Sequence, residues 1–345
     1  MHVSNKMVFH LSDSFYMAIK STDAVALELN PDSWQEQMVK LDKLRNNYQS
    51  FIKIPGNEYL TEQSFRIRDY TDELKQALQS EPAMVNSLLY RSYKLKEDFE
   101  EDTFLDLYIF QTGRKLGKVG AGVEDYYESQ KLIIEAYADM VKEKKKKEKD
   151  IDFESLNDIT EKMQTAYRRG DLDLMDSLDL ITDQSDAFRE KFIYKRNEIQ
   201  ANSIDTIIRQ RSLFVGVGAA HLPGDRGVIE ILRKKGYTLR PIKMADRDAV
   251  QKSKIDTLKV PVVFGRRFSD DGFYSVEVPG ELYNVSQDFF IGDRKQYADM
   301  SNGSYYIVTR VKTYGAFLNQ PENTILKKID SLLYENIPDN KDYQG

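Results

Sequence analysis

The chain has no cysteine and only three histidines, which limits its chemistry from the start. Without cysteine there is no disulfide, no cysteine-ligated zinc and no cysteine nucleophile. Any reaction that needs an imidazole must use His2, His10 or His221. No apolar run reaches the ~18 residues expected of a membrane-spanning helix. The net charge is −6 and basic residues are interspersed with acidic ones, so no nucleic-acid partner is predicted.

Several common catalytic motifs are also missing. The sequence has no HExxH zinc motif, no GxSxG nucleophile elbow and no Walker A loop. The stretch Gly216-Val-Gly218-Ala-Ala-His221 partly resembles the dinucleotide fingerprint GxGxxG. However, a histidine stands where the third glycine would be, and Pro223 follows soon after. Close packing of a helix against a phosphate is therefore not expected, and nucleotide binding is not predicted.

What the sequence does contain predicts an α/β fold. Its 345 residues, 41% of them hydrophobic, suffice for a large domain and a small one. Short apolar runs predict strands at 24–29 and 213–217. A further strand is predicted at 238–242, joined to the strand at 213–217 by a helix in a right-handed βαβ unit. Residues 34–210 have mainly helical periodicity, apart from a short strand or turn at 118–124. We predict a three-layer core with a mixed or parallel sheet and a large helical insertion.

Beyond residue 246 the mainly helical periodicity gives way to segments with the pattern of strands. We therefore place one domain at 1–245 and a small α+β domain at 246–345. The tail is predicted to contain three strands and a final helix, at 260–264, 273–278, 305–311 and 323–334.

Two residues combine unusual positions with chemical capacity. His221 directly follows the predicted strand 213–217, and ligands of open α/β sheets collect at the carboxyl ends of strands. Gly218 and the two alanines after it allow a ligand to approach this loop closely. Glu28 lies inside an apolar strand, where a buried carboxylate needs an arginine, a metal or a proton as partner. A solvent-facing strand edge would explain Glu28 equally well.

A cation on an apolar helix face raises the same question. Phe188 to Arg209 is predicted to be one long amphipathic helix, with Phe192, Arg196 and Ile199 on the same face. Arg196 is either a surface side chain whose stem covers apolar residues or an inward cation that pairs with Glu28 or with a substrate oxyanion.

Together these residues suit a divalent metal. Two neutral imidazoles, His2 and His221, with the carboxylate of Glu28 would form a manganese, cobalt or zinc site with positions left for water. Glu28 could instead be the general base, which the spacing does not decide. Taken alone, a histidine at position 2 more often belongs to a disordered terminus. Metal binding should weaken as pH falls through the histidine pKa, ordinarily near 6.5.

The sequence resembles the TraB/GumN family, which includes Tiki-type proteins. Gly218-Ala-Ala-His221 and the helix after it resemble the second GxxH motif of that family. The segments around His2 and Glu28 resemble its first GxxH block and its glutamate strand. The remaining matching positions are the pair Arg196-Asn197 and weaker middle motifs, at Leu105-Asp106, Gly122-Val123-Glu124 and Gln130.

This resemblance implies a metallohydrolase, most simply a peptidase with a peptide or protein substrate. Tiki-type members use two GxxH histidines and a glutamate with a divalent metal, so Asp106, Glu124, Asn197 and Gly218 become supporting candidates. The related erythromycin-esterase and ChaN-like group implies a three-layer α/β core. The alternatives are a protein that binds a peptide or haem without turnover, and a degenerate member with a structural role.

One family feature is missing from the sequence. The family has a glycine three residues before its first histidine, at the end of a strand, and this chain begins at Met1. We expect an extracytoplasmic location if a segment that carries a signal precedes this sequence, and a cytoplasmic one otherwise.

Overall fold

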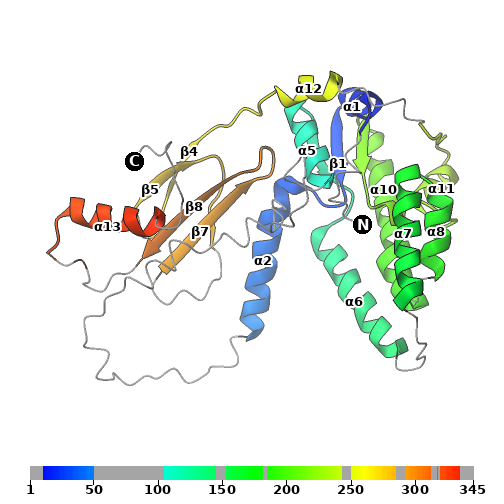
Figure 1. Cartoon of the computed structure of the whole chain (residues 1–345), viewed down its shortest axis with the longest axis horizontal. Coiled ribbons are helices and arrows are strands. Elements are labelled where there is room, and N and C mark those ends of the chain that lie inside the picture. The colour runs from blue at the N-terminus through cyan, green and yellow to red at the C-terminus, as the bar shows by residue number, and fades with distance from the viewer. Residues whose placement is uncertain are drawn as a thin grey trace. The chain divides into compact units, whose positions relative to one another are not determined.

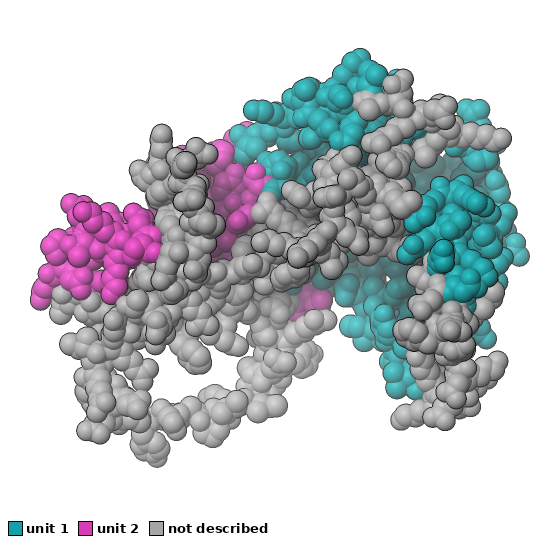
Figure 2. Space-filling view, in the orientation of Figure 1, with its two compact units in different colours: residues 1–38, 89–262, 300–303 teal, residues 39–88, 263–299, 304–345 magenta. Residues whose placement is uncertain are grey.

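Three short parallel strands form the sheet around which the first part of the chain folds (Figure 1). The computed structural model describes residues 11–49, 105–144, 153–181, 185–242, 250–284, 292–311, 317 and 319–334. The chain divides into two compact units, which Figure 2 shows in teal and magenta. Unit 1 comprises residues 1–38, 89–262 and 300–303, and unit 2 comprises residues 39–88, 263–299 and 304–345.

Unit 1 alternates strands with helices. Its elements in chain order are α1 (Asp13–Lys20), β1 (Ala24–Leu27), the start of α2 (Pro31–Gln49), α5 (Leu105–Lys115), β2 (Val119–Gly122), α6 (Tyr126–Lys144), α7 (Phe153–Arg169), α8 (Leu172–Ile181), α9 (Asp186–Arg189), the π-helical η2 (Glu190–Lys195), α10 (Arg196–Ile208), β3 (Leu213–Gly216), the 3-10 turn η3 (Ala219–His221), α11 (Val228–Lys234) and α12 (Val250–Asp256). The sheet order is β2-β1-β3, with β1 parallel to both neighbours. The predicted α/β class is therefore confirmed.

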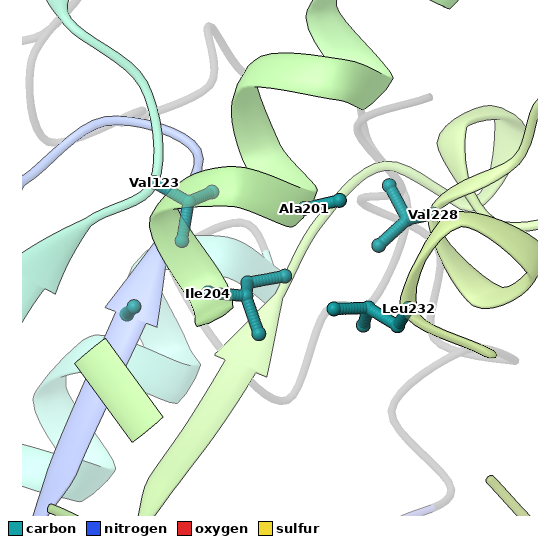
Figure 3. Close-up of a cluster of buried hydrophobic side chains, with 6 residues drawn as sticks. Val123, Ala201, Ile204, Val228 and Leu232 are labelled. Atoms are coloured by element: carbon teal, nitrogen blue, oxygen red, sulfur yellow. The ribbon is translucent and has the colours of Figure 1, made fainter. Parts of the chain in front are cut away.

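Helices cover both faces of this sheet. Alternate side chains of β1 point to opposite faces, so apolar residues are available for packing on each face. Val25 meets α5, which approaches so closely that a Cβ on Gly113 would lie 2.6 Å from Val25 Cγ2. Ala26 belongs instead to a buried apolar cluster on the other face, with Ala201 and Ile204 of α10. Helix α11 adds to this cluster, and Figure 3 shows α10 and α11 facing each other across it.

The predicted helix at 188–209 is confirmed, although its middle is irregular. α9, η2 and α10 follow one another without a break, and η2 is π-helical. A π segment shifts the helical register, so the faces before and after it no longer align as they would in an α-helix. In α10 the buried positions are Arg196, Asn197, Gln200, Ala201 and Ile204. Ile199, predicted to share the face of Arg196, is only partly buried.

One predicted strand of unit 1 is not formed. Residues 237–242 have no regular secondary structure, so the expected βαβ unit that ends in a strand at 238–242 is wrong. Side-chain contacts, rather than the backbone hydrogen bonds of a β-ladder, hold residues 237–242 in place. The hydroxyl of Tyr237 donates to Asp205 Oδ1 at 2.6 Å, and Leu239 packs against the cluster beneath α10 and α11. Ile242 is 70% exposed, so its apolar character does not reflect burial in a sheet.

Unit 2 contains separate antiparallel sheets. Its described elements are β4 (Gly265–Phe268), β5 (Ser275–Val278), β6 (Tyr283–Asn284), β7 (Gly292–Asp299), β8 (Ser304–Val311) and α13 (Glu322–Tyr334). β4 pairs with β5, while β6, β7 and β8 form a second sheet. The expected strands near 273–278 and 305–311 and the final helix are confirmed. The domain boundary at 245/246 stays a prediction.

The strand predicted at 260–264 is wrong. This stretch has no regular structure, and the first strand of unit 2 begins at Gly265. Pro261 has no backbone N–H to give to a ladder, and the side chains of Val263 and Phe264 are exposed. Strands β4 and β7 were not predicted, because their charged sequences lack an apolar run.

Candidate metal and catalytic site

The carboxyl ends of the three parallel strands bring the polar candidates together. Glu28 follows β1 directly, and Glu124 and Gly218 lie two residues after β2 and β3. Strand β1 is two residues shorter than predicted, so Glu28 lies just outside the ladder rather than within it. The backbone N–H of Glu124 donates to the carbonyl oxygen of Glu28 at 2.8 Å. Parallel pairing thus gathers three loops at one edge, where open α/β sheets place their ligands.

The Glu28 carboxylate is held from two sides. Its Oε1 accepts from the backbone N–H of Gly218 at 2.7 Å, and its Oε2 accepts from Arg196 Nη2 at 2.8 Å. The glutamate side chain keeps 25% of its surface exposed, whereas that of Arg196 keeps 7%. Arg196 therefore points inward from α10 to Glu28. The alternative, in which Glu28 faces solvent at a strand edge, does not account for this pairing with Arg196.

Glu124 is the second carboxylate of the site and is more deeply buried. Only 1% of its side chain is exposed. Its Oε2 accepts from Arg196 Nε at 3.0 Å, and its Oε1 accepts from Gln200 Nε2 at 2.5 Å. Arg196 thus bridges two carboxylates, which offsets much of the cost of burying them. Among the described residues, Gln200 Oε1 is a buried acceptor without a hydrogen-bond partner.

His221 is oriented by Asn197. The ring Nδ1 lies 2.7 Å from Asn197 Oδ1, while Asn197 Nδ2 donates to the carbonyl oxygen of Arg226 at 2.8 Å. Because the asparagine oxygen can only accept, the proton belongs on Nδ1 and the lone pair on Nε2. That nitrogen lies 3.8 Å from Glu28 Oε1. His221 therefore presents an unprotonated nitrogen toward the glutamate.

The environment of His221 keeps it neutral. The pKa of this imidazole is lowered from 6.5 to about 4, mainly by burial. The charge of Glu28 opposes the shift, and the charge of Arg196 adds to it. The ring is therefore uncharged near pH 7, which is the form that ligates metals. The ordinary pKa near 6.5, used for the sequence-based expectation of pH dependence, does not hold for this histidine.

These side chains can together hold a cation. Glu28, Glu124 and His221 each offer one ligand atom, and these atoms all lie within 4.8 Å of one another. Two carboxylate oxygens and an imidazole nitrogen match the ligands that manganese, cobalt and zinc accept. The donor set fits a divalent ion, although such an ion would compete with Arg196 for the same oxygens. Glu124, expected only to support the site, is one of the three clustered residues.

The other candidates fall in different places. His2 lies outside the described residues. Asp106, in the first turn of α5, lines a cavity next to the cluster but is not one of the three clustered residues. Gln200 was missed, although its position four residues after Arg196, on the same helical face, could have indicated it.

The cavity has a volume of about 380 Å³ and reaches the site. Glu28, Arg196 and Gly218 line one part of it. The remaining lining is mostly apolar and comes from α2, α5, α6, α7 and η2, and from the ends of β1 and β3 with the loops that follow them. Within the described residues, no helix is both long and apolar enough to cross a membrane.

The fold and the site define an α/β protein with a carboxylate–histidine cluster at the carboxyl edge of a parallel sheet. The sequence pattern of the TraB/PrgY/gumN family matches residues 1–241. The chain therefore belongs to the TraB/PrgY/gumN family, and the resemblance to that family is confirmed. The relation to the erythromycin-esterase and ChaN-like group stays a prediction.

Two curated proteins share short stretches with this chain. It is 40% identical to metalloprotease TIKI2 of Xenopus tropicalis over 53 residues, which are 14% of this chain and 10% of that protein. It is 37% identical to metalloprotease TIKI2 of Danio rerio over 62 residues, 17% of this chain and 12% of that protein. The matched stretches thus span about a tenth of either relative. No solved structure matches the chain significantly.

Proposed function

We propose that this protein is a divalent-metal-dependent hydrolase that acts on peptide bonds. The observation that carries the proposal is the gathering of Glu28, Glu124 and His221, from three separate strand-end loops, within 4.8 Å. The short similarity to two metalloproteases supports the reaction class. His2, expected as a second imidazole ligand, remains part of the proposal.

The residues divide into holding and reacting groups. Glu124 and His221 are suited to hold the ion, because one is almost fully buried and the other has its ring fixed by Asn197. A bound divalent ion would polarise a substrate carbonyl and make water more acidic. Glu28 is the member of the three-residue cluster that lines the cavity, so it is placed to accept a proton from water, whether or not it also ligates.

Arg196 has a separate role in this proposal. Its guanidinium lines the cavity and is already held by Glu28 and Glu124, so it is preorganised beside any carbonyl that reaches Glu28. A fixed cation there stabilises negative charge that develops on the carbonyl oxygen. We expect this contribution to be worth roughly 10²–10³-fold in turnover.

One observation favours a second candidate, a protein that binds a peptide or haem in the same cavity without turnover. Arg196 already neutralises much of the charge of Glu28 and Glu124, so the site does not need an ion to be electrostatically satisfied.

Measuring metal binding to the full chain distinguishes the hydrolase from the non-catalytic binding protein. The protein is stripped with a chelator and titrated with Mn²⁺, Co²⁺ and Zn²⁺ by calorimetry, for the wild type, His221→Ala and Glu28→Gln. Glu128→Gln, an exposed carboxylate at the start of α6, is the matched control. We expect binding to be lost in the two site variants, together with metal-dependent cleavage of a quenched peptide library. Unchanged affinity for all three ions in both site variants would exclude the metal site and leave the binding protein.

A further inference from the structure

The cavity beside Glu28 has walls that the proposed reaction does not use. Much of its apolar lining comes from helices that lie far apart in the sequence. Trp34 and Met38 belong to α2, Tyr126 and Ile133 to α6, and Phe192 to η2. Phe192 also connects the two parts of the site, because the guanidinium of Arg196 lies 5.5 Å from its ring centre. The apolar chamber and the charged cluster are thus continuous.

The size of the chamber limits what can enter it. About 380 Å³ lies at the lower end of the range of small-molecule sites, roughly 300–1,000 Å³. One aromatic side chain, which buries about 150–250 Å², and the peptide unit that carries it are suitable occupants of such a space.

The charges around the chamber limit its occupant further. Glu28 and Asp106 both line the cavity, and the one cation among its described lining residues, Arg196, is already paired with two carboxylates. Asp106 is close enough to Tyr167 that it adds to the effect of burial in raising the pKa of that hydroxyl. An acidic side chain would meet two carboxylates there, whereas a neutral apolar one would not.

We propose that this chamber is a specificity pocket for one bulky apolar side chain, aromatic or large aliphatic, of a peptide substrate. The proposal rests on the proposed function, since it places the peptide bond next to that side chain at the Glu28 and Arg196 end of the cavity. Leu105 and Ile133 form part of the apolar wall, and Trp34 reports on its occupancy.

The single tryptophan provides a direct test that requires neither metal nor turnover. Trp34 is the only tryptophan of the chain, so its emission reports on this cavity alone. The metal-free full chain is titrated with N-acetyl-phenylalaninamide, N-acetyl-leucinamide, N-acetyl-alaninamide and N-acetyl-glutamic acid amide. We expect the phenylalanine and leucine compounds to saturate the emission change at concentrations at least about 10-fold lower than the alanine compound. The acidic compound should produce no saturable change.

Two neighbouring isoleucines provide a matched pair of variants. Ile133 lines the cavity, whereas Ile134, next to it on α6, is 57% exposed. Ile133→Ala should reduce the preference for phenylalanine over alanine by about 10-fold or more. Ile134→Ala should leave it unchanged. Equal affinities for the four compounds, or the same effect in both variants, would overturn the pocket.

The outcome also separates this proposal from the proposed function. Selective binding of apolar compounds by a protein that binds no metal and cleaves no peptide supports the pocket and removes the hydrolase. Metal-dependent cleavage with no preference for bulky apolar residues supports the hydrolase and removes the pocket.

Discussion

His221 and Asn197 form a buried side-chain hydrogen bond of 2.7 Å that fixes which ring nitrogen faces Glu28. Asn197 lies in the first turn of α10 and His221 at the end of η3, so the bond connects the helix to the loop after β3. It sets both the tautomer and the plane of the imidazole. Outer partners of this kind raise the metal affinity of a histidine by orienting it.

The first prediction concerns this bond. Asn197→Ala removes the acceptor for Nδ1–H, so the ring can turn or change tautomer, and we expect affinity for Mn²⁺ or Zn²⁺ to fall about 10–100-fold. Calorimetry on the chelator-treated protein measures it. Asn202→Ala, at an exposed position of the same helix, should bind as the wild type does. Equal affinity in the two variants would mean that Asn197 has no orienting role.

The second prediction concerns the bridging arginine. Arg196→Ala leaves the carboxylates of Glu28 and Glu124 without their shared cation, so the free energy of unfolding should fall by about 3–5 kcal/mol. Urea unfolding followed by Trp34 emission measures the loss. Lys195→Ala, which removes an exposed pair with Glu198, should cost no more than about 1 kcal/mol.

The third prediction uses the same variant with a metal. A divalent ion can supply the positive charge that Arg196→Ala removes. Mn²⁺ should therefore raise the thermal midpoint of Arg196→Ala more than that of the wild type. A thermal melt with and without the ion measures the difference. A smaller stabilisation of the variant than of the wild type would argue that Arg196 and the ion do not share the carboxylates.

The fourth prediction concerns acid stability. The hydroxyl of Tyr237, followed by Arg209, lowers the pKa of Asp205 from 3.8 to about 2. The native state keeps this carboxylate ionised after the unfolded chain has taken up a proton. Its contribution is therefore present above pH 3.8 and is lost as pH falls toward about 2.

Tyr237→Phe tests that relationship, because it removes the largest cause of the shift. We expect the pKa of Asp205, followed by NMR of the carboxyl carbon, to move up toward 3.8, and acid unfolding to begin at higher pH. Tyr137→Phe keeps its ring contacts with Phe188 and Phe192 and should leave the titration unchanged. A pKa of Asp205 that stays near 2 in Tyr237→Phe would assign the shift to its other partners, Arg209 and Lys235.

The fifth prediction concerns the support beneath the site. Ile204 is buried with Ala26 and Val123 between α10, the sheet and α11 (Figure 3). Ile204→Ala should reduce the free energy of unfolding by about 2–5 kcal/mol, because it leaves a cavity under α10. The exposed neighbour Thr206 provides the control, for which a change within about 0.5 kcal/mol is expected on substitution by alanine. Equal losses in the two variants would contradict the described packing.

Several parts of the site could be read from local sequence. Glu28 and His221 stood out because each follows or interrupts a short apolar run, and Arg196 because it is a cation on an apolar helix face. Such signals depend on neighbours within a few residues, which periodicity captures well. For the same reason the helix that contains Arg196 was predicted with nearly correct ends.

Other parts were beyond local reasoning. Strands were predicted at 238–242 and 260–264, but the structure forms no ladder there. A strand needs a partner with free backbone groups, and the sequence does not state which edge is available. The charged segments β4 and β7 are the opposite case. They lack an apolar run, yet they form strands because each pairs with a neighbouring strand.

The sequence by itself determined the residue types of this site, the helix that carries Arg196 and Asn197, and the existence of the two strands near Glu28 and His221. Only the tertiary structure decided that Glu124 joins them, that Gln200 accompanies it and that Arg196 bridges both carboxylates. Glu28 and Arg196 are 168 residues apart, and Glu124 and Arg196 are 72 apart. Parallel pairing of β1 with β2 and β3 brings these loops to one edge. That pairing depends on contacts distant in sequence, which no local pattern encodes.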